Sequence, residues 1–353
     1  MFLFNSKSAP MLGIDISSTA VKVVEVVKKG NQIRVESHAV EPLPADAVAE
    51  KVVQDVEAVG EAIRKAVKKS GSKTRQAAVA VPGSSVITKI IPMPAALGEE
   101  ELEAQIQTEA EQYIPYPLEE INLDFEVQGP SEDAEDTVDV LLAASKSENV
   151  EMRSSAIALG GLSAKIMDVE PYTVEHVCRA VPQMLPDDGH NRTIAVIDVG
   201  ATVTSLNVIH DLQLIYTREQ PFGGKQLTEE IMRRYGLSYE DAGRVKKHGG
   251  LPDNYEPDVL EPFKSTMAQQ VSRFLQFFFS SSDYEAVDQI LLCGGCAGID
   301  GIDEFIETHM DMPTAIGNPF QHLTLGSKVN RNRLIEDGPS MMIALGLALR
   351  GVD

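Results

Sequence analysis

Two similar stretches stand far apart in this chain, and they constrain its fold more than any other feature. The first reads LGIDISSTAVKVVEV from Leu12 to Val26, and the second reads AVIDVGATVTSLNVI from Ala195 to Ile209. Each is an apolar strand that delivers an Asp, Asp15 or Asp198, into a short turn before a second strand returns. Such a turn presents backbone N–H groups, hydroxyls and a carboxylate, which suit a metal-bound phosphate chain. We therefore predict two related domains that face a common ligand.

Composition narrows the class of protein. The length of 353 residues predicts about two or three domains. The net charge of −22 opposes association with nucleic acid, so we expect no nucleic-acid partner. The three cysteines, Cys178, Cys293 and Cys296, form no disulfide framework, which fits a reducing compartment. No stretch approaches the roughly 18 consecutive apolar residues that cross a bilayer, so we expect a cytoplasmic protein without a transmembrane segment.

Breaks in the apolar pattern divide the chain into two halves. Pro182 to Asn191, rich in Pro, Asp and Gly, is the clearest linker. The second half repeats the order of the first, a hairpin followed by a third strand. We predict an α/β fold with a flexible leader over 1–10, a first core over 11–83 and 162–184, an inserted α+β subdomain over 84–161, a second core over 185–222 and 283–353, and a helical subdomain over 223–282.

Periodicity predicts the elements of the first half. Apolar residues three or four apart indicate a helix over 45–69, which Gly71 closes as a C-cap. The segment 162–169 returns to an apolar strand, and the helix over 173–180 that follows belongs with it in the first core. For the insert we predict strands at 86–91, 121–127 and 138–144 and helices at 99–113 and 148–159.

Two Gly-Gly turns in the second half complete the pattern. Gly223-Gly224 precedes a helix, and Cys293-Gly294-Gly295 lies between an apolar strand at 287–293 and a helix over 298–308. Such glycines allow a ligand to approach the backbone at a helix N-terminus, where the dipole favours anions. With the two Asp hairpins, these elements stand in the order needed for a nucleotide held between two duplicated domains.

Other chemistries have weaker support. Cys293-Gly-Gly-Cys296 fits half of a zinc or redox site, but no further Cys or His pair completes four ligands. The histidines are scattered without metal-ligand spacing, and neither a GxSxG elbow nor a Walker A loop is present. A metalloenzyme, a hydrolase triad and a P-loop ATPase are therefore disfavoured.

The order of elements resembles the actin, hexokinase and heat-shock-chaperone ATPase superfamily over nearly the whole chain. The insert after AVAVPGSSV, the IPYPLEEINLDFEVQG segment and the short C-terminus are similar to the PilM family of type IV pilus assembly. FtsA, the other similar family, ends in a long tail with a membrane-binding helix. The resemblance implies duplicated actin-like (ribonuclease H-like) domains, an inserted α+β subdomain of the FtsA/PilM type and a second, helical subdomain.

The resemblance also implies ATP and Mg as cofactors and assigns roles to residues. Asp15 and Asp198 stand near the metal, and Glu170 is the catalytic candidate that positions water. The first turn is Ser-Ser-Thr where many active relatives have a Gly, so we expect weak ATPase activity at most. The other nucleotide contacts are Ser17, Ser18, Thr19 and Lys22 in the first turn, Gly200, Ala201 and Thr202 in the second, Gly223, Gly224, Lys225 and Glu229 near the sugar and base, and Gly294, Gly295 and Gly298 over the nucleoside.

Our first hypothesis is an ATP-binding scaffold whose nucleotide sets the angle between domains and the shape of a partner groove. The resemblance implies that this groove, between the first core and the insert, takes the cytoplasmic N-terminal peptide of PilN, an inner-membrane protein. PilN would hold the chain at the inner membrane, and other pilus-assembly components and self-association are further candidate interactions. Two alternatives are a small-molecule kinase with Glu170 or Asp168 as base and an FtsA-like, polymer-forming division protein.

Overall fold

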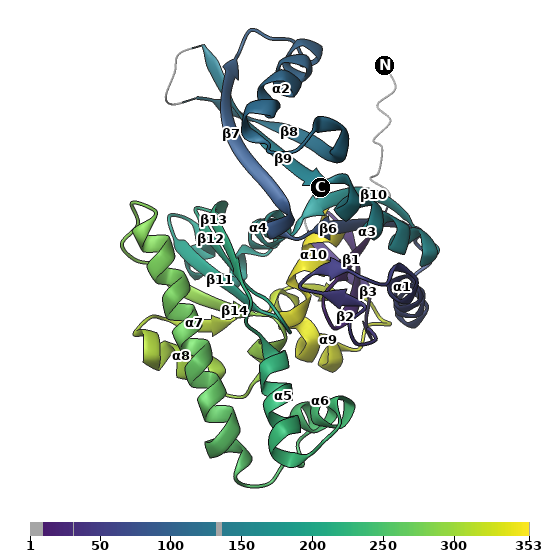
Figure 1. Cartoon of the computed structure of the whole chain (residues 1–353), viewed down its shortest axis with the longest axis vertical. Coiled ribbons are helices and arrows are strands. Elements are labelled where there is room, and N and C mark those ends of the chain that lie inside the picture. Colours follow the sequence, from purple (N-terminus) through teal and green to yellow (C-terminus); the bar gives the residue numbers. More distant parts are fainter. Residues whose placement is uncertain (1–9, 31, 132–135, 353) are drawn as a thin grey trace.

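Two β-sheets form the centres of two cores in a computed structural model that describes residues 10–30, 32–131 and 136–352 (Figure 1). Residues 1–9 of the predicted leader lie outside this part. In spatial order, the first sheet contains β10 (Ser163–Val169), β6 (Gln76–Val81), β1 (Leu12–Ile16), β2 (Ala20–Lys29), β3 (Gln32–Pro42) and β16 (Thr324–Leu325). The second contains β13 (Gln213–Gln220), β12 (Thr204–His210), β11 (Thr193–Val199), β14 (Gln289–Cys293) and β15 (Thr314–Ile316).

The predicted duplication is visible in the pairing of these strands. β1 runs antiparallel to β2 and parallel to β6, and β11 runs antiparallel to β12 and parallel to β14. Asp15 lies opposite Lys22 in the first hairpin, and Asp198 lies opposite Ser205 in the second. The two aspartates therefore occupy equivalent positions at the ends of the two central strands.

The predicted helix over 45–69 is wrong in its first part. The chain there forms a small hairpin of β4 (Val48–Ala49) and β5 (Val52–Val53), and α1 (Val56–Ser70) begins only after Asp55, whose side chain caps the helix. Valines four residues apart suit a helix face, but they also fall on the two arms of this hairpin. Gly71 closes α1 in the left-handed conformation, φ 71°, as predicted.

The C-terminal helix α10 (Met342–Leu349) lies at the centre of the molecule, between β1 and α4 (Glu170–Ala180) (Figure 1). A Cβ on Gly13 would stand 2.0 Å from the carbonyl oxygen of Ala344, and one on Gly346 would stand 2.1 Å from that of Thr173. Glycine at both positions lets the backbones touch. α10 packs in one hydrophobic core with residues of both sheets, so it joins the two halves.

The insert stands apart from the cores (Figure 1). Its sheet has the order β7 (Val86–Pro94), β9 (Thr137–Lys146), β8 (Ile121–Pro130), and α2 (Glu99–Tyr113) packs on one face through Leu102 and Ile106. The helix α3 (Ser147–Leu159) falls within the predicted insert of 84–161. It packs on α1 in the first core, where Gly60 lets Leu159 approach closely.

The second half carries the remaining helices, α5 (Gly224–Tyr235), α6 (Tyr239–His248), α7 (Glu261–Ser280), α8 (Ile302–Met310) and α9 (Arg331–Asp337). A short π-helical turn, Glu256–Leu260, leads directly into α7. β16, from the segment predicted for the second core, instead pairs with β3 in the first sheet. Among the described residues, no helix is both long and apolar enough to cross a bilayer.

Candidate functional site

A cavity of about 520 Å³ lies at the ends of the two central strands, large enough for a nucleotide-sized ligand. Of the predicted site residues, Thr202, Gly223 and Glu229 are not part of its lining. The lining includes Asp15, Ser17, Ser18, Thr19, Lys22, Glu170, Asp198, Gly200, Ala201, Gly224, Lys225, Gly294, Gly295 and Gly298. The cavity thus brings together residues of both cores that the sequence assigned to one site.

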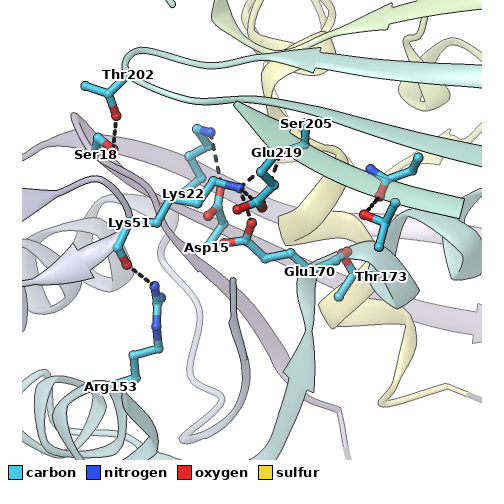
Figure 2. A network of polar contacts seen from close by, with 12 residues as sticks. Asp15, Ser18, Lys22, Lys51, Arg153, Glu170, Thr173, Thr202, Ser205 and Glu219 are labelled. Carbon is cyan, nitrogen blue, oxygen red and sulfur yellow. Dashed lines mark hydrogen bonds and ion pairs between the residues drawn. The ribbon is translucent and has the colours of Figure 1, made fainter. Parts of the chain in front are cut away.

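The two hairpin turns meet across this cavity. Ser18 Oγ and Thr202 Oγ1 are 2.8 Å apart and share a hydrogen bond (Figure 2). In the first turn, Ser17 donates from both its backbone N–H, at 3.1 Å, and its hydroxyl, at 2.8 Å, to the carbonyl of Ala20. Ser17 therefore fixes the turn, and Ser18 and Thr202 link the two cores.

Asp15 is only 3% exposed and forms an ion pair with Lys22, whose Nζ lies 2.9 Å from Asp15 Oδ2. Burial acts to lower the pKa of Lys22, but the charges of Asp15 and Asp198 outweigh it and raise that pKa. Lys22 is therefore a permanent cation beside the two aspartates.

Asp198 is partly buried, and burial raises its pKa to about 6, although Lys22 and Lys51 act in the opposite direction. A Cβ on Gly294 would lie 2.6 Å from Asp198 Oδ1, so the Gly294 backbone packs against this carboxylate. Among the described residues Asp198 makes no direct ion pair, although it faces a cavity that also contains Asp15. Two such carboxylates suit a hard divalent cation.

The described segments contain no cluster of three or more His, Cys, Asp or Glu that could hold a metal. A cation between Asp15 and Asp198 would therefore take its other ligands from water and from oxygens of a bound phosphate. This is the way in which proteins usually hold Mg²⁺. The donor set fits a magnesium–nucleotide complex better than a free metal ion.

Lys51, which the sequence reasoning missed, is the central cation on the floor of the cavity. It reaches in from the β4–β5 turn, and its Nζ lies 2.6 Å from Glu170 Oε2, 2.7 Å from Glu219 Oε1 and 3.1 Å from Ser205 Oγ (Figure 2). All three charged side chains are mostly buried: Lys51 is 14% exposed, Glu170 is 7% exposed and Glu219 is 10% exposed. The two carboxylates raise the pKa of Lys51 despite its burial.

This ion cluster changes the surroundings of Glu170, the predicted catalytic residue. Glu170 is the first residue of α4 and not the end of the preceding strand, and its carboxylate is already held by Lys51. Burial acts to raise the pKa of Glu219, but its bonds with Lys51 lower that pKa overall. Glu170 and Glu219 come from different cores, so Lys51 connects the two halves of the molecule.

The Gly223-Gly224 turn serves packing more than ligand approach. The first amides of α5, those of Gly224 and Lys225, donate to the carbonyls of Gly200 and Ala201 at 3.0 and 2.8 Å. A Cβ on Gly223 would stand 2.5 Å from the backbone of Ala201. The helix therefore begins directly on the second hairpin turn, and its first N–H groups are occupied by the protein's own backbone.

Farther along the cleft, Thr228 of α5 lines the cavity, while Glu229 points to solvent. Lys246 of α6 donates from Nζ to Thr228 Oγ1 at 2.6 Å and to the carbonyl of Gly224 at 3.1 Å. Burial lowers the pKa of Lys246 and raises that of Cys296 to about 11. A thiol with such a pKa stays protonated and is a poor nucleophile, which argues against a redox role. For the zinc half-site, the described residues offer no cluster of three or more metal-ligating side chains.

Comparison with known proteins identifies the family. The family described as type IV pilus assembly protein PilM matches residues 13–352. This chain belongs to the PilM family. A solved structure described as the PilM-PilN type IV pilus biogenesis complex is 27% identical, covers 98% of this chain and 99% of its own, and has a TM-score of 0.81. The predicted family and the predicted actin-like fold are thus confirmed.

One further match is by sequence, and one solved structure with low sequence identity shares the fold. Cell division protein FtsA of Bacillus subtilis (strain 168) is 25% identical over 271 residues, which cover 71% of this chain and 61% of FtsA. The chain thus spans less than two thirds of the length of that relative. The structure of MreB5 of Spiroplasma citri bound to ADP is 14% identical, with coverage of 97% and 96% and a TM-score of 0.51.

Proposed function

We propose that this protein is an ATP-binding scaffold of type IV pilus assembly and that it binds the cytoplasmic N-terminal peptide of PilN. The observation that carries the proposal is the likeness to a PilM-PilN complex over 98% of the chain at a TM-score of 0.81. PilN is an inner-membrane protein, so the peptide would hold the chain at the cytoplasmic side of that membrane.

The cavity supports the nucleotide half of the proposal. A bound Mg²⁺ would neutralise phosphate charge, with Asp15 and Asp198 oriented toward it from equivalent ends of the two central strands. Lys22 adds a fixed positive charge, and the hydroxyl of Ser18, which lines the cavity, can exchange its bond with Thr202 for a bond to a phosphate oxygen. The enclosed volume of about 520 Å³ accommodates the nucleoside beyond the turns.

The ion cluster of Lys51 favours slow or absent hydrolysis. A general base must accept a proton, or at least orient water, with a free carboxylate oxygen. Lys51 Nζ lies 2.6 Å from Glu170 Oε2, and both side chains are 14% exposed or less, so the carboxylate is fixed in place and only its second oxygen is left to orient water. Asp168, the other candidate base, is outside the cavity lining and accepts from the backbone N–H of Val169. Glu170 and Asp168 are also the two candidate bases of the kinase alternative, so their surroundings disfavour that alternative as well.

The face of the insert sheet opposite α2 is our candidate contact for the PilN peptide. Ile90, 63% exposed, and Glu126 lie on either side of Leu141 in adjacent strands of this face. Burial, together with the charges of Glu175 and Glu126, raises the pKa of Tyr172 in α4 to about 12, so the charge of Glu126 acts on this residue of the first core. An acidic and apolar face of this kind suits a peptide with basic and apolar side chains.

The test is a titration of the PilN N-terminal peptide, labelled with a fluorophore, into the purified protein with and without Mg-ATP. We expect saturable binding, weakened by Glu126→Lys and unchanged by Glu103→Lys. The control makes the same charge change on the exposed side of α2. Absence of binding with and without Mg-ATP would refute the partner assignment. Equal binding by Glu126→Lys and Glu103→Lys would show that the peptide does not bind at the face that carries Glu126.

A further inference from the structure

The ion cluster on the cavity floor also contacts the segment by which the chain returns from the insert. The backbone carbonyl of Lys51 accepts a hydrogen bond from Arg153 Nη2 at 2.6 Å (Figure 2). Arg153 is 3% exposed and lies on α3, which follows β9 of the insert sheet without a break. Any displacement of the Lys51 turn therefore acts on the helix that anchors this end of the insert.

The same cluster contacts the segment by which the chain enters the insert. Glu219, the second carboxylate partner of Lys51, lies beside this segment: a Cβ on Gly83 would stand 3.9 Å from Glu219 Oε1, and the neighbouring Ser84 side chain helps to lower the pKa of Glu219. Ser84 lies in the single helical turn Gly83–Ser85 that leads directly into β7. The two connections are tied to each other as well, since Ser145 Oγ donates to the carbonyl of Ser85 at 3.0 Å. We call residues 83–86 and 145–153 the root of the insert.

Lys51 is placed to respond to a ligand in the cavity. Lys51 lines the cavity together with Asp15 and Asp198. A phosphate that binds in the cavity offers Lys51 a third anionic partner, whereas a divalent cation there repels the Lys51 ammonium group. Either ligand changes the strength of the ion pairs that Lys51 forms with Glu170 and Glu219. Glu50 and Lys51 both have left-handed backbones, φ 48° and 66°, which define a tight turn. The Lys51 side chain that faces the carboxylates and the Lys51 carbonyl that accepts from Arg153 thus belong to the same turn.

We propose that Lys51 is the residue that couples the nucleotide cavity to the insert, through Arg153 at one connection and through Glu219 and Ser84 at the other. The inference rests on the proposed function for its ligand. It adds a route by which occupancy of the cavity changes the position of the insert sheet, and therefore the surface offered to a partner. Coupling of this kind requires differential contacts in the two states, which the Lys51 cluster supplies.

Hydrogen–deuterium exchange with and without Mg-ATP tests the route without requiring a partner. In the wild-type protein we expect Mg-ATP to change protection both at the hairpin turns and at the root of the insert. Lys51→Met should keep the response at the turns and lose it at the root. Ser84→Ala removes one exposed hydroxyl and should lose the response at residues 83–86. Glu50→Gln, in the same turn but exposed, should behave as wild type.

The outcomes separate the inference from the proposed function. Protection at the turns without any change at the root in the wild type overturns the coupling and leaves nucleotide binding intact. No protection at the turns refutes nucleotide binding and the inference with it. If Lys51→Met does not fold, Ser84→Ala provides the test: a wild-type change in protection at residues 83–86 on adding Mg-ATP overturns the proposed route. With a binding peptide, we expect Mg-ATP to alter its affinity by about 5-fold or more, and Lys51→Met to reduce this ratio toward one.

Discussion

Adjacent glycines in the Cys293-Gly294-Gly295 turn should respond in opposite ways to the same substitution. Gly294 has φ 86°, and a Cβ there would lie 2.5 Å from the carbonyl oxygen of Val199 and 2.6 Å from Asp198 Oδ1. At Gly295 a Cβ would meet nothing within 4 Å. Both residues line the cavity, so they differ in packing and not in their distance from the site.

For Gly294→Ala, the left-handed backbone costs about 1–2 kcal/mol and forced overpacking a further 1–3 kcal/mol or so. We therefore expect a loss of roughly 2–5 kcal/mol in the free energy of unfolding, together with displacement of the Asp198 carboxylate and weaker Mg-nucleotide binding. Gly295→Ala should leave stability unchanged and weaken nucleotide binding only if the ligand passes over this glycine.

The assay pairs thermal melting of both variants with titration of a fluorescent ATP analogue in Mg²⁺. A shift of about 2–4 °C in melting temperature corresponds to 1 kcal/mol in domains somewhat smaller than this chain. Normal stability in Gly294→Ala would refute the packing argument. If Gly295→Ala keeps both normal stability and normal nucleotide affinity, this turn does not contact the nucleoside as predicted.

Three further predictions follow from the buried charges and the central helix. Because burial raises the pKa of Asp198 to about 6, its neutral form stabilises the protein at low pH, and this contribution is lost as pH rises through 6. The affinity for Mg-nucleotide should rise over the same range, since a metal needs the carboxylate; Asp198→Asn should flatten that pH profile in titrations at pH 5 to 7.5. Lys51→Met leaves two mostly buried carboxylates unpaired, so chemical denaturation should show a loss of about 3–5 kcal/mol, whereas Arg233→Met, in an exposed pair, should melt like the wild type. Gly13→Ala should prevent α10 from seating on β1, because its Cβ would stand 2.0 Å from the Ala344 carbonyl, and a soluble protein with normal melting would contradict this packing.

The sequence predicts local features of this protein better than its long-range contacts. The sequence predicts the Asp15 and Asp198 hairpins because the two stretches repeat the same residue pattern. It also predicts α2 at its observed bounds, 99–113, because charged residues and prolines mark the ends of this helix. Gly71 was identified as a C-cap by the same kind of local signal.

The features that the sequence does not predict depend on contacts between residues far apart along the chain. Lys51 was hidden inside a predicted helix, and its bonds to Glu170 and Glu219 span 119 and 168 residues. α3 followed the insert strands in sequence and was assigned with them, but its apolar face fits α1. One usable signal was overlooked: two adjacent charged residues, Glu50 and Lys51, interrupt the apolar spacing at the point where the hairpin turns.

The pairing of β16 with β3 has a consequence for synthesis on the ribosome. The hydroxyl of Thr324 donates to the carbonyl of Ile33, 291 residues earlier, and β16 completes the edge of the first sheet. During translation, Arg34 and Val35 of β3 therefore lack their strand partner until nearly all of the chain has emerged, and exposed strand edges promote mispairing between nascent chains. Slow synthesis or truncation before residue 324 should thus favour aggregation of the N-terminal half, so correct folding of the first core depends on the last part of the message.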